Sequence, residues 1–279
     1  MLNRLSIIGI LILFFGLFRT TVSISQTVNW KKVKVLVYTK NGKGYVHDNI
    51  PNAVQCIQKL GQQNGFSVDV SDQPTVFTED NLKQYTLLIF PSTNNDVFDT
   101  DGQRLAFRRY IEAGGGFVGI HSVMGTERNW NWFKRMLGGT FAWHPKFQKF
   151  KVEVLDTKHL STQGLPKSWE KEDEFYFTKN MSPGPTVIMA NDLTSLNQDE
   201  PEKVKTFAGS YTELYPSAWY YEFDGGHTWC TTLGHAKTDY DTDTTFIKHI
   251  FQGIRYVAGQ VTKIDFSKAY ADSRDTPIR

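Results

Sequence analysis

The fold is decided by one stretch of sequence, Gly114-Gly115-Gly116-Phe117-Val118-Gly119-Ile120-His121-Ser122. Its first glycines allow the backbone to turn sharply after a helix. The apolar run that follows predicts a strand buried on both faces, which ends at the polar pair His121 and Ser122. In an open α/β sheet, ligands bind just beyond the carboxyl ends of such strands. We therefore expect a reaction centre at His121, with Ser122 beside it.

The segments around this strand alternate between strand and helix patterns. Predicted strands occupy residues 33–38, 66–70, 85–90, 150–154 and 186–190, and a predicted hairpin pairs 218–223 with 228–233. Predicted helices end at residue 64, run from the Thr100–Gln103 capping box to the Gly114 triplet, and cover 244–258. This alternation predicts a mostly parallel sheet with helices on both faces. The polar stretches 156–183 and 192–216 favour irregular structure.

Residues 1–25 have the features of a signal peptide. Arg4 supplies a positive charge, residues 7–18 form an apolar run broken only by glycines, and two serines at the −3 and −1 positions suit cleavage before Gln26. The run is shorter than the roughly 20 apolar residues of a membrane span. We therefore expect an exported protein, periplasmic or extracellular, with no stable membrane span after cleavage. An uncleaved membrane anchor is the alternative.

Cleavage would leave the chain without net charge. It removes Arg4 and Arg19 from the 31 Lys and Arg residues, and none of the 29 Asp and Glu residues. A nucleic-acid-binding protein needs a basic face that neutralises phosphates. The charge balance therefore argues against nucleic acid as a partner.

Four of the seven histidines lie where predicted strands or loops end. His47, His121 and His235 each follow a strand of the proposed sheet, and His144 follows the His121 strand by one short helix. Because the carboxyl ends of parallel strands gather at one edge, we expect these histidines to converge. Together with Asp48, four imidazoles could form a divalent-metal site or an acid–base site. Taken singly, each histidine is explained as well by a cap, a turn or a surface position.

The sequence around His121 has the strand–turn–helix layout of a nucleophile elbow. His121 stands at the position of the nucleophile in Gly119-Ile120-His121-Ser122-Val123. The two cysteines, Cys56 and Cys230, fall on an apolar helix face and within a predicted strand, where we expect buried free thiols. Thiol hydrolysis of glutamine therefore has no nucleophile here. Ser122 is a weaker candidate, because adjacent residues on a strand point to opposite sides.

One acidic group lies beside aromatic residues, in Asp173-Glu174-Phe175-Tyr176. Glu174 can supply a carboxylate to the histidines as an acid, a base or an acceptor for a sugar hydroxyl, and a solvated acidic loop is the alternative. The chain is rich in aromatic residues, with 7 Trp, 12 Tyr and 20 Phe. Aromatic rings often line sugar-binding clefts, which makes Trp143 and Trp219 candidate stacking walls, although most aromatic side chains fill cores and interfaces.

Together these motifs resemble the ThuA-like family of the trehalose-utilisation type, a branch of the class I glutamine-amidotransferase-like superfamily. The resemblance covers residues 33–259 and lies in the order and spacing of short motifs. These are His47-Asp48, 114–122, Trp132–Leu137 with Gly138, His144-Pro145, Gly164-Leu165-Pro166, Asp173–Tyr176, Pro216–Trp219, Leu233-Gly234-His235 and Gly253–Tyr256. The resemblance implies a flavodoxin-like three-layer α/β sandwich whose amidotransferase nucleophile is replaced, and a link to carbohydrate metabolism.

The sequence thus predicts three parts: a signal peptide at 1–25, one α/β domain at 26–259 and a C-terminal tail at 260–279. We expect an enzyme that acts on a sugar or glycoside as a hydrolase or an isomerase, and not as a glutamine amidotransferase. A non-catalytic module that binds a sugar or a partner is the alternative. The predicted catalytic residues are His121, as central acid–base group or ligand, its carboxylate partner Glu174, His144 and His235. The predicted substrate-binding residues are His47, Asp48, Ser122, Trp143, Tyr176 and Trp219. The sequence leaves open a divalent metal held by the histidines and the formation of a homo-oligomer.

Overall fold

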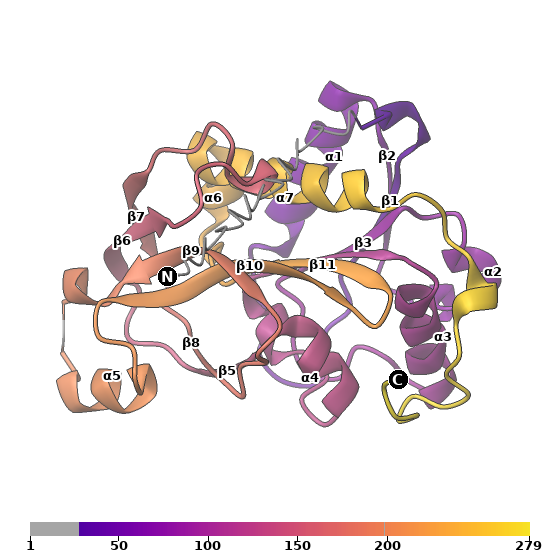
Figure 1. Cartoon of the computed structure of the whole chain (residues 1–279). Helices are drawn as coiled ribbons and strands as arrows, with labels where there is room; N and C mark the ends of the chain where they lie inside the picture. Colours follow the sequence, from indigo (N-terminus) through magenta and orange to yellow (C-terminus); the bar gives the residue numbers. More distant parts are fainter. Residues whose placement is uncertain (1–27, 198) are drawn as a thin grey trace, which may run out of the picture.

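Within residues 28–197 and 199–279, which the computed structural model describes, nine strands form one sheet (Figure 1). The predicted signal peptide lies outside these residues. The strand order is β2-β1-β3-β4-β11-β10-β9-β6-β7. The parallel half comprises β1 (Lys34–Tyr38), β2 (Ser67–Ser71), β3 (Leu87–Pro91), β4 (Gly116–Ile120) and β11 (Gly226–Thr231). The antiparallel half comprises β10 (Leu214–Phe223), β9 (Thr186–Asp192), β6 (Gln148–Val154) and β7 (Ser168–Asp173).

Helices cover both faces of this sheet. α1 (Ile50–Asn64) and α7 (Thr244–Gln260) pack on one face, and α3 (Asp101–Glu112) and α4 (Asn131–Leu137) pack on the other (Figure 1). The remaining elements are short: α2 (Glu79–Leu82), α5 (Pro201–Ala208), α6 (Lys237–Asp241) and a ribbon of β5 (Thr140–Trp143) with β8 (Phe177–Lys179). None of the helices in the described residues is both long and apolar enough to cross a membrane. The predicted three-layer α/β fold is confirmed.

β4 lies inside the parallel half, and its sequence allows the neighbouring elements to approach closely. Phe117 packs into the α3 side of the core, and Ile120 packs into the α7 side. Gly114 makes the turn after α3 with φ +91°, a conformation that glycine adopts at little cost. A Cβ at Gly116 would lie 2.5 Å from Val257 of α7, so a larger residue there would push this helix away.

The register of the parallel strands aligns their carboxyl ends. Ile120 of β4 pairs with Pro91 of β3 on one side and with Thr231 of β11 on the other. The residues that follow each strand therefore share one edge of the sheet. His121 and Thr232 are among them, which places the predicted centre where a parallel sheet binds its ligands.

Two segments that we expected to be irregular contain regular elements. The stretch 156–183 includes β7, whose burial alternates along the strand, but two of its inward side chains are the charged Lys171 and Asp173. Alternation of apolar and polar residues is the signal by which a strand is recognised in a sequence. Charged residues on the inward face hide that signal. In the same way, the charge-rich stretch 192–216 contains α5.

The C-terminal tail packs on α3 through buried charges. Arg108 and Glu112 form an ion pair with Nε and Oε1 2.8 Å apart. Arg108 donates a hydrogen bond to the carbonyl of Arg274, and Glu112 accepts one from the amide of Tyr270. Asp224 accepts a hydrogen bond of 2.7 Å from the Tyr270 hydroxyl and lies 3.6 Å from Arg108. We call Arg108, Glu112 and Asp224 the Arg108 clamp.

Candidate functional site

His121 follows β4 in a left-handed backbone conformation, with φ +53°. Because Ile120 pairs with Thr231, the next residue on each strand is adjacent, and His121 Nδ1 lies 2.9 Å from the carbonyl oxygen of Thr232. A carbonyl can only accept, so Nδ1 carries a proton and Nε2 is the nitrogen left for other partners. The side chain is fully buried. A strained residue held in this way is typical of functional sites.

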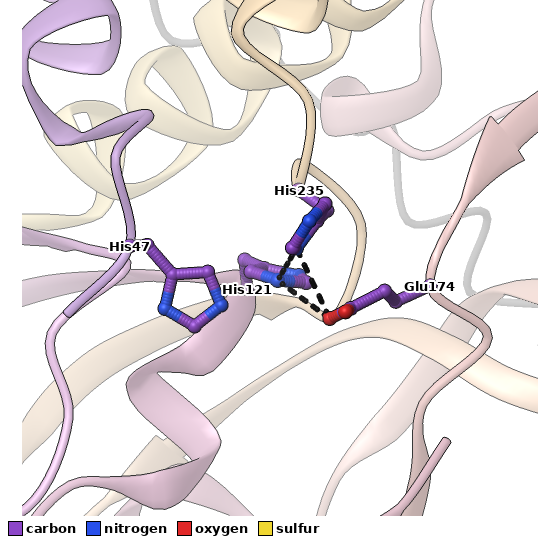
Figure 2. A group of neighbouring side chains, drawn as sticks. All are labelled: His47, His121, Glu174 and His235. Atoms are coloured by element: carbon purple, nitrogen blue, oxygen red, sulfur yellow. Dashed lines mark hydrogen bonds and ion pairs between the residues drawn. The ribbon is translucent and has the colours of Figure 1, made fainter. Parts of the chain in front are cut away.

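His47 reaches the same edge from the loop between β1 and α1. Its Nδ1 lies 3.0 Å from Ser122 Oγ, which itself donates to the carbonyl of Thr93 at 3.2 Å. His47 Nδ1 is therefore the donor, and its other nitrogen points toward His121 (Figure 2). Burial, aided by the charges of His121 and His235, lowers the pKa of His47 to about 3. The imidazole is neutral near physiological pH.

Asp173, at the end of β7, fixes the two remaining side chains of the site. Its carboxylate is fully buried and accepts hydrogen bonds from the backbone amides of Glu174 at 2.8 Å, Gly234 at 2.7 Å and His235 at 3.0 Å. The loop after β11 is thereby tied to the end of β7. This contact brings Glu174 and His235 together from opposite halves of the sheet.

Glu174 and His235 meet His121 at the centre of the site (Figure 2). Glu174 Oε2 lies 3.1 Å from His235 Nδ1 and 3.4 Å from His121 Nε2, and the two nitrogens are 3.3 Å apart. Burial alone would raise the pKa of Glu174, but its hydrogen bonds to the two histidines hold that pKa well below the usual range. Burial would lower the pKa of His235, but the Glu174 carboxylate raises it.

Four side chains each offer one potential ligand atom, and these four atoms all lie within 4.8 Å of one another. The residues are His47, His121, Glu174 and His235. We call these four residues the His–Glu cluster. They come from four separate segments of the chain (Figure 2). Nitrogen and carboxylate ligands that converge in this way can hold a metal ion or exchange protons with a substrate.

A pocket of about 420 Å³ opens onto the His–Glu cluster. It is lined by Tyr45, His47, Asn94, Ser122, Gly125, Arg128, Phe141, His144, Glu174 and Tyr176. This volume lies within the range of about 300–1,000 Å³ that small-molecule sites occupy. A cavity of about 470 Å³ formed by residues 28–33, 83–86 and 258–264 lies at the amino ends of β1 and β3 and has no histidine or carboxylate among its lining residues. The pocket at the His–Glu cluster is therefore the better candidate for a functional site than this second cavity, because titratable side chains line it.

Two more predicted residues lie at the edge of the cluster. The Tyr176 hydroxyl is 3.1 Å from His121 Nε2. His144 Nε2 is 3.4 Å from Glu174 Oε1, and its Nδ1 is 2.8 Å from the carbonyl oxygen of Pro145. About a third of the His144 side chain is exposed, so it faces the pocket more openly than the buried members of the cluster. The structure thus brings all four predicted histidines to one edge, with Glu174 between them.

Three predicted substrate-binding residues do not line the pocket. Trp219 is fully buried on the α4 side of the sheet, where its Nε1 donates to a backbone carbonyl of α4. Trp143 stacks on Phe207 of α5. Asp48 is largely exposed and pairs with Lys237 at 2.9 Å. The pocket lining therefore differs from the predicted set at these three positions, because aromatic content and sequence proximity do not show which face a side chain occupies.

The sequence prediction lacks five pocket residues: Tyr45, Asn94, Gly125, Arg128 and Phe141. A signal existed for Asn94, which lies in the polar run after β3, just as His121 follows β4. Tyr45 lies two residues before His47 on the same loop. Arg128 and Phe141 reach the pocket only through tertiary packing, with the guanidinium 5.7 Å from the ring centre. No local sequence pattern indicates that pair.

Two crystal structures of putative ThuA-like proteins are similar to this one. The protein from Bacteroides uniformis ATCC 8492 aligns with a TM-score of 0.65 and 23% identity, over 83% of this chain and 93% of that one. The protein from Parabacteroides merdae ATCC 43184 aligns with a TM-score of 0.62 and 17% identity, over 83% and 92%. At these identities the likeness shows the fold alone.

A more distant likeness, also of fold alone, links the chain to a putative GMP synthase protein from Thermoplasma acidophilum. That alignment has a TM-score of 0.50 and 13% identity, over 81% of this chain and 94% of that one. No curated protein matches the sequence. The family model ThuA, described as trehalose utilisation, matches residues 34–257. This match spans most of the chain and confirms the resemblance found in the sequence motifs: the protein belongs to the ThuA family.

Proposed function

We propose that the protein is an enzyme of carbohydrate utilisation that acts on a sugar or glycoside in the pocket above the His–Glu cluster. The observation that carries this proposal is the junction of that pocket with a buried set of histidines and a carboxylate. Membership of a trehalose-utilisation family supports the choice of substrate class. A pocket joined to convergent titratable groups is the usual form of an active site.

The walls of the pocket suit a sugar. Tyr45, Phe141 and Tyr176 supply aromatic faces on which the apolar side of a sugar ring can stack. Asn94 and Arg128 supply side-chain hydrogen-bond donors for its hydroxyl groups. These residues take the role that the sequence suggested for Trp143 and Trp219. The mixture of apolar faces with a few polar groups is typical of specific small-molecule sites.

The chemistry available in the pocket is proton transfer. His144 is the most exposed histidine in contact with Glu174, and it is placed to give a proton to a substrate oxygen or take one from it. The elbow position holds His121, and both cysteines are buried elsewhere, Cys56 in α1 and Cys230 in β11. A thiol-dependent amide hydrolysis therefore has no nucleophile at this edge, and we propose hydrolysis or isomerisation of the sugar instead.

A turnover screen on disaccharides and their keto derivatives tests this function. We expect at least one substrate to be converted, and His144→Ala to lower kcat/KM by about 100-fold or more, as the loss of a general acid or base does. His227→Ala is the matched control, because His227 lies at the amino end of β11, away from the pocket, and its loss leaves kcat/KM unchanged. Tight sugar binding without any turnover would contradict an enzyme and indicate a non-catalytic binding module.

We also propose that the protein acts outside the cytoplasm. The support is the pattern of residues 1–25, with Arg4 before an apolar run and small residues before Gln26. Mass spectrometry of the protein from its native host tests this proposal. A mature chain that begins at Gln26 is expected, and an intact Met1 in a soluble cytoplasmic fraction would contradict export.

A further inference from the structure

The two most buried histidines of the His–Glu cluster are held in a single tautomer. His121 donates through Nδ1 to the carbonyl of Thr232, and His47 donates through Nδ1 to Ser122. In both rings Nε2 is therefore the nitrogen left to bind a metal at the centre of the cluster. Histidines that bind metals almost always donate their other ring N–H to a carbonyl, a carboxylate or water, which fixes this orientation.

The spacing of the inner ligand atoms also fits a metal ion. His121 Nε2, His235 Nδ1 and Glu174 Oε2 form a triangle with sides of 3.1, 3.3 and 3.4 Å. Ligands about 2.0–2.1 Å from a tetrahedral zinc ion lie about 3.4 Å from one another. His47 completes the set, since its ligand atom lies within 4.8 Å of the other three.

The structure assigns a metal site to the His–Glu cluster: we propose that it binds one divalent transition-metal ion of the zinc type. Three imidazoles and one carboxylate suit zinc, iron, nickel or copper, whereas magnesium and calcium prefer oxygen ligands. The pocket gives the ion a route from solvent, and a substrate oxygen would bind it from this side as a fifth ligand. A bound metal would act as a Lewis acid on that oxygen.

Without a metal, the same contacts would serve as a hydrogen-bonded network. Tyr176 would donate to His121 Nε2, and His235 would donate to Glu174. In that case the cluster would have no preference for transition metals. Metal binding is independent of the sugar reaction, so it is measured on the purified protein without any substrate.

The test is a titration of the chelator-treated full-length protein with Co²⁺, which reports nitrogen coordination by its visible absorption. We expect one Co²⁺ per chain, displacement by Zn²⁺, and no displacement by an excess of Mg²⁺ or Ca²⁺. His235→Ala and Glu174→Gln should each weaken the Co²⁺ affinity by at least about 100-fold, beyond the 10- to 100-fold typical of residues that only orient a ligand. Elemental analysis of the protein as purified gives the natural metal.

Two controls keep this test decisive. His227→Ala removes a histidine from the other end of β11 and should bind Co²⁺ like the parent chain. His235 is partly exposed, so its alanine variant is expected to fold, and circular dichroism verifies this. Absence of the absorption band in the parent chain would overturn the proposal. Equal Co²⁺ affinity in the parent chain and both cluster variants would overturn it too.

Discussion

The protein buries charged side chains in two places that differ in how their polar atoms are used. In the Arg108 clamp, Arg108 and Glu112 pair with each other and with backbone groups of the tail. In the His–Glu cluster, lone pairs of several side chains converge beside a pocket. The polar atoms of the clamp form their hydrogen bonds with other groups of the protein itself. In the cluster, several nitrogen and oxygen atoms remain available to a ligand. These available atoms, rather than burial of charge, distinguish a functional site from a structural one.

The largest effect is expected at the clamp, on stability. Arg108→Ala leaves Glu112 buried without its ion-pair partner, and breaking a buried pair on one side costs about 3–5 kcal/mol. Urea denaturation should show this loss in the free energy of unfolding, and limited proteolysis should show release of the tail. The proposed sugar reaction, measured per folded molecule, should change little, because no residue of the clamp lines the pocket.

An exposed ion pair supplies the control for the clamp. Lys83 pairs with Asp80 at 2.9 Å on the surface, and Lys83→Ala should leave the unfolding free energy unchanged within error. If Arg108→Ala behaved like this control, the buried pair would contribute no more than a surface pair. Stability would then not distinguish the Arg108 clamp from the His–Glu cluster.

At the His–Glu cluster we expect a substitution to lower activity and to leave the stability of the fold almost unchanged. His235→Ala removes a partly exposed side chain whose polar contacts are to other members of the cluster. We expect kcat/KM to fall by about 100- to 1,000-fold, while the free energy of unfolding changes by no more than about 1 kcal/mol. Steady-state kinetics and urea denaturation of the same preparation measure both. A large loss of stability with unchanged activity would place His235 with the clamp rather than with the site.

The sequence predicts the cluster better than it predicts the pocket around it, for a physical reason. A buried parallel strand has a strong apolar pattern, and the residue after it lies at a known edge, so β4 and His121 can be located. The pocket walls come from loops joined by tertiary packing, and neither Arg128 nor Phe141 carries a local signal. Trp219 is fully buried beside α4, and its sequence context does not show that its indole packs there rather than in the pocket.

The same reasoning explains why the sequence predicts residues 260–279 only as a tail. Its backbone amides and carbonyls pair with Arg108 and Glu112, and a sequence does not reveal which buried charges face which backbone groups. β7 was missed because Lys171 and Asp173 occupy inward positions where a strand normally has apolar residues. Sequence patterns therefore locate apolar elements and miss those held by buried charge.

Asp173 contributes both to stability and to the geometry of the site. Its substitution should therefore have a smaller effect on the free energy of unfolding than Arg108→Ala and a smaller effect on kcat/KM than His235→Ala. Its carboxylate holds the backbone of Gly234 and His235 beside Glu174. Asp173→Asn weakens three hydrogen bonds to a charged acceptor, for a loss of about 1–3 kcal/mol in unfolding free energy. It also loosens the cluster, so we expect kcat/KM to fall about 10-fold. An effect on only one of the two measurements would show that Asp173 serves stability or the site, but not both.

The smallest effect is expected from Asp239, which is buried behind the site and pairs with Lys171. Burial first, and then the charge of Asp173, raise the pKa of Asp239 to about 6, although Lys171 opposes this shift. Because the folded protein holds this proton more tightly than the unfolded chain, the contribution of Asp239 to stability is present at low pH. It is lost as the pH rises from about 4 through about 6.

Asp239→Asn removes this titration and leaves Lys171 beside Asp173 and Asp243. The unfolding free energy of the parent chain, measured relative to the variant in urea at pH 4.5 and pH 7, should therefore be lower at pH 7. Parallel stability curves would show that Lys171 compensates the buried carboxylate fully at both pH values. In that case the charges around Lys171 would resemble the Arg108 clamp, because each of them would have a compensating partner. Buried polar atoms without such a partner would then be a feature of the His–Glu cluster alone among these three groups.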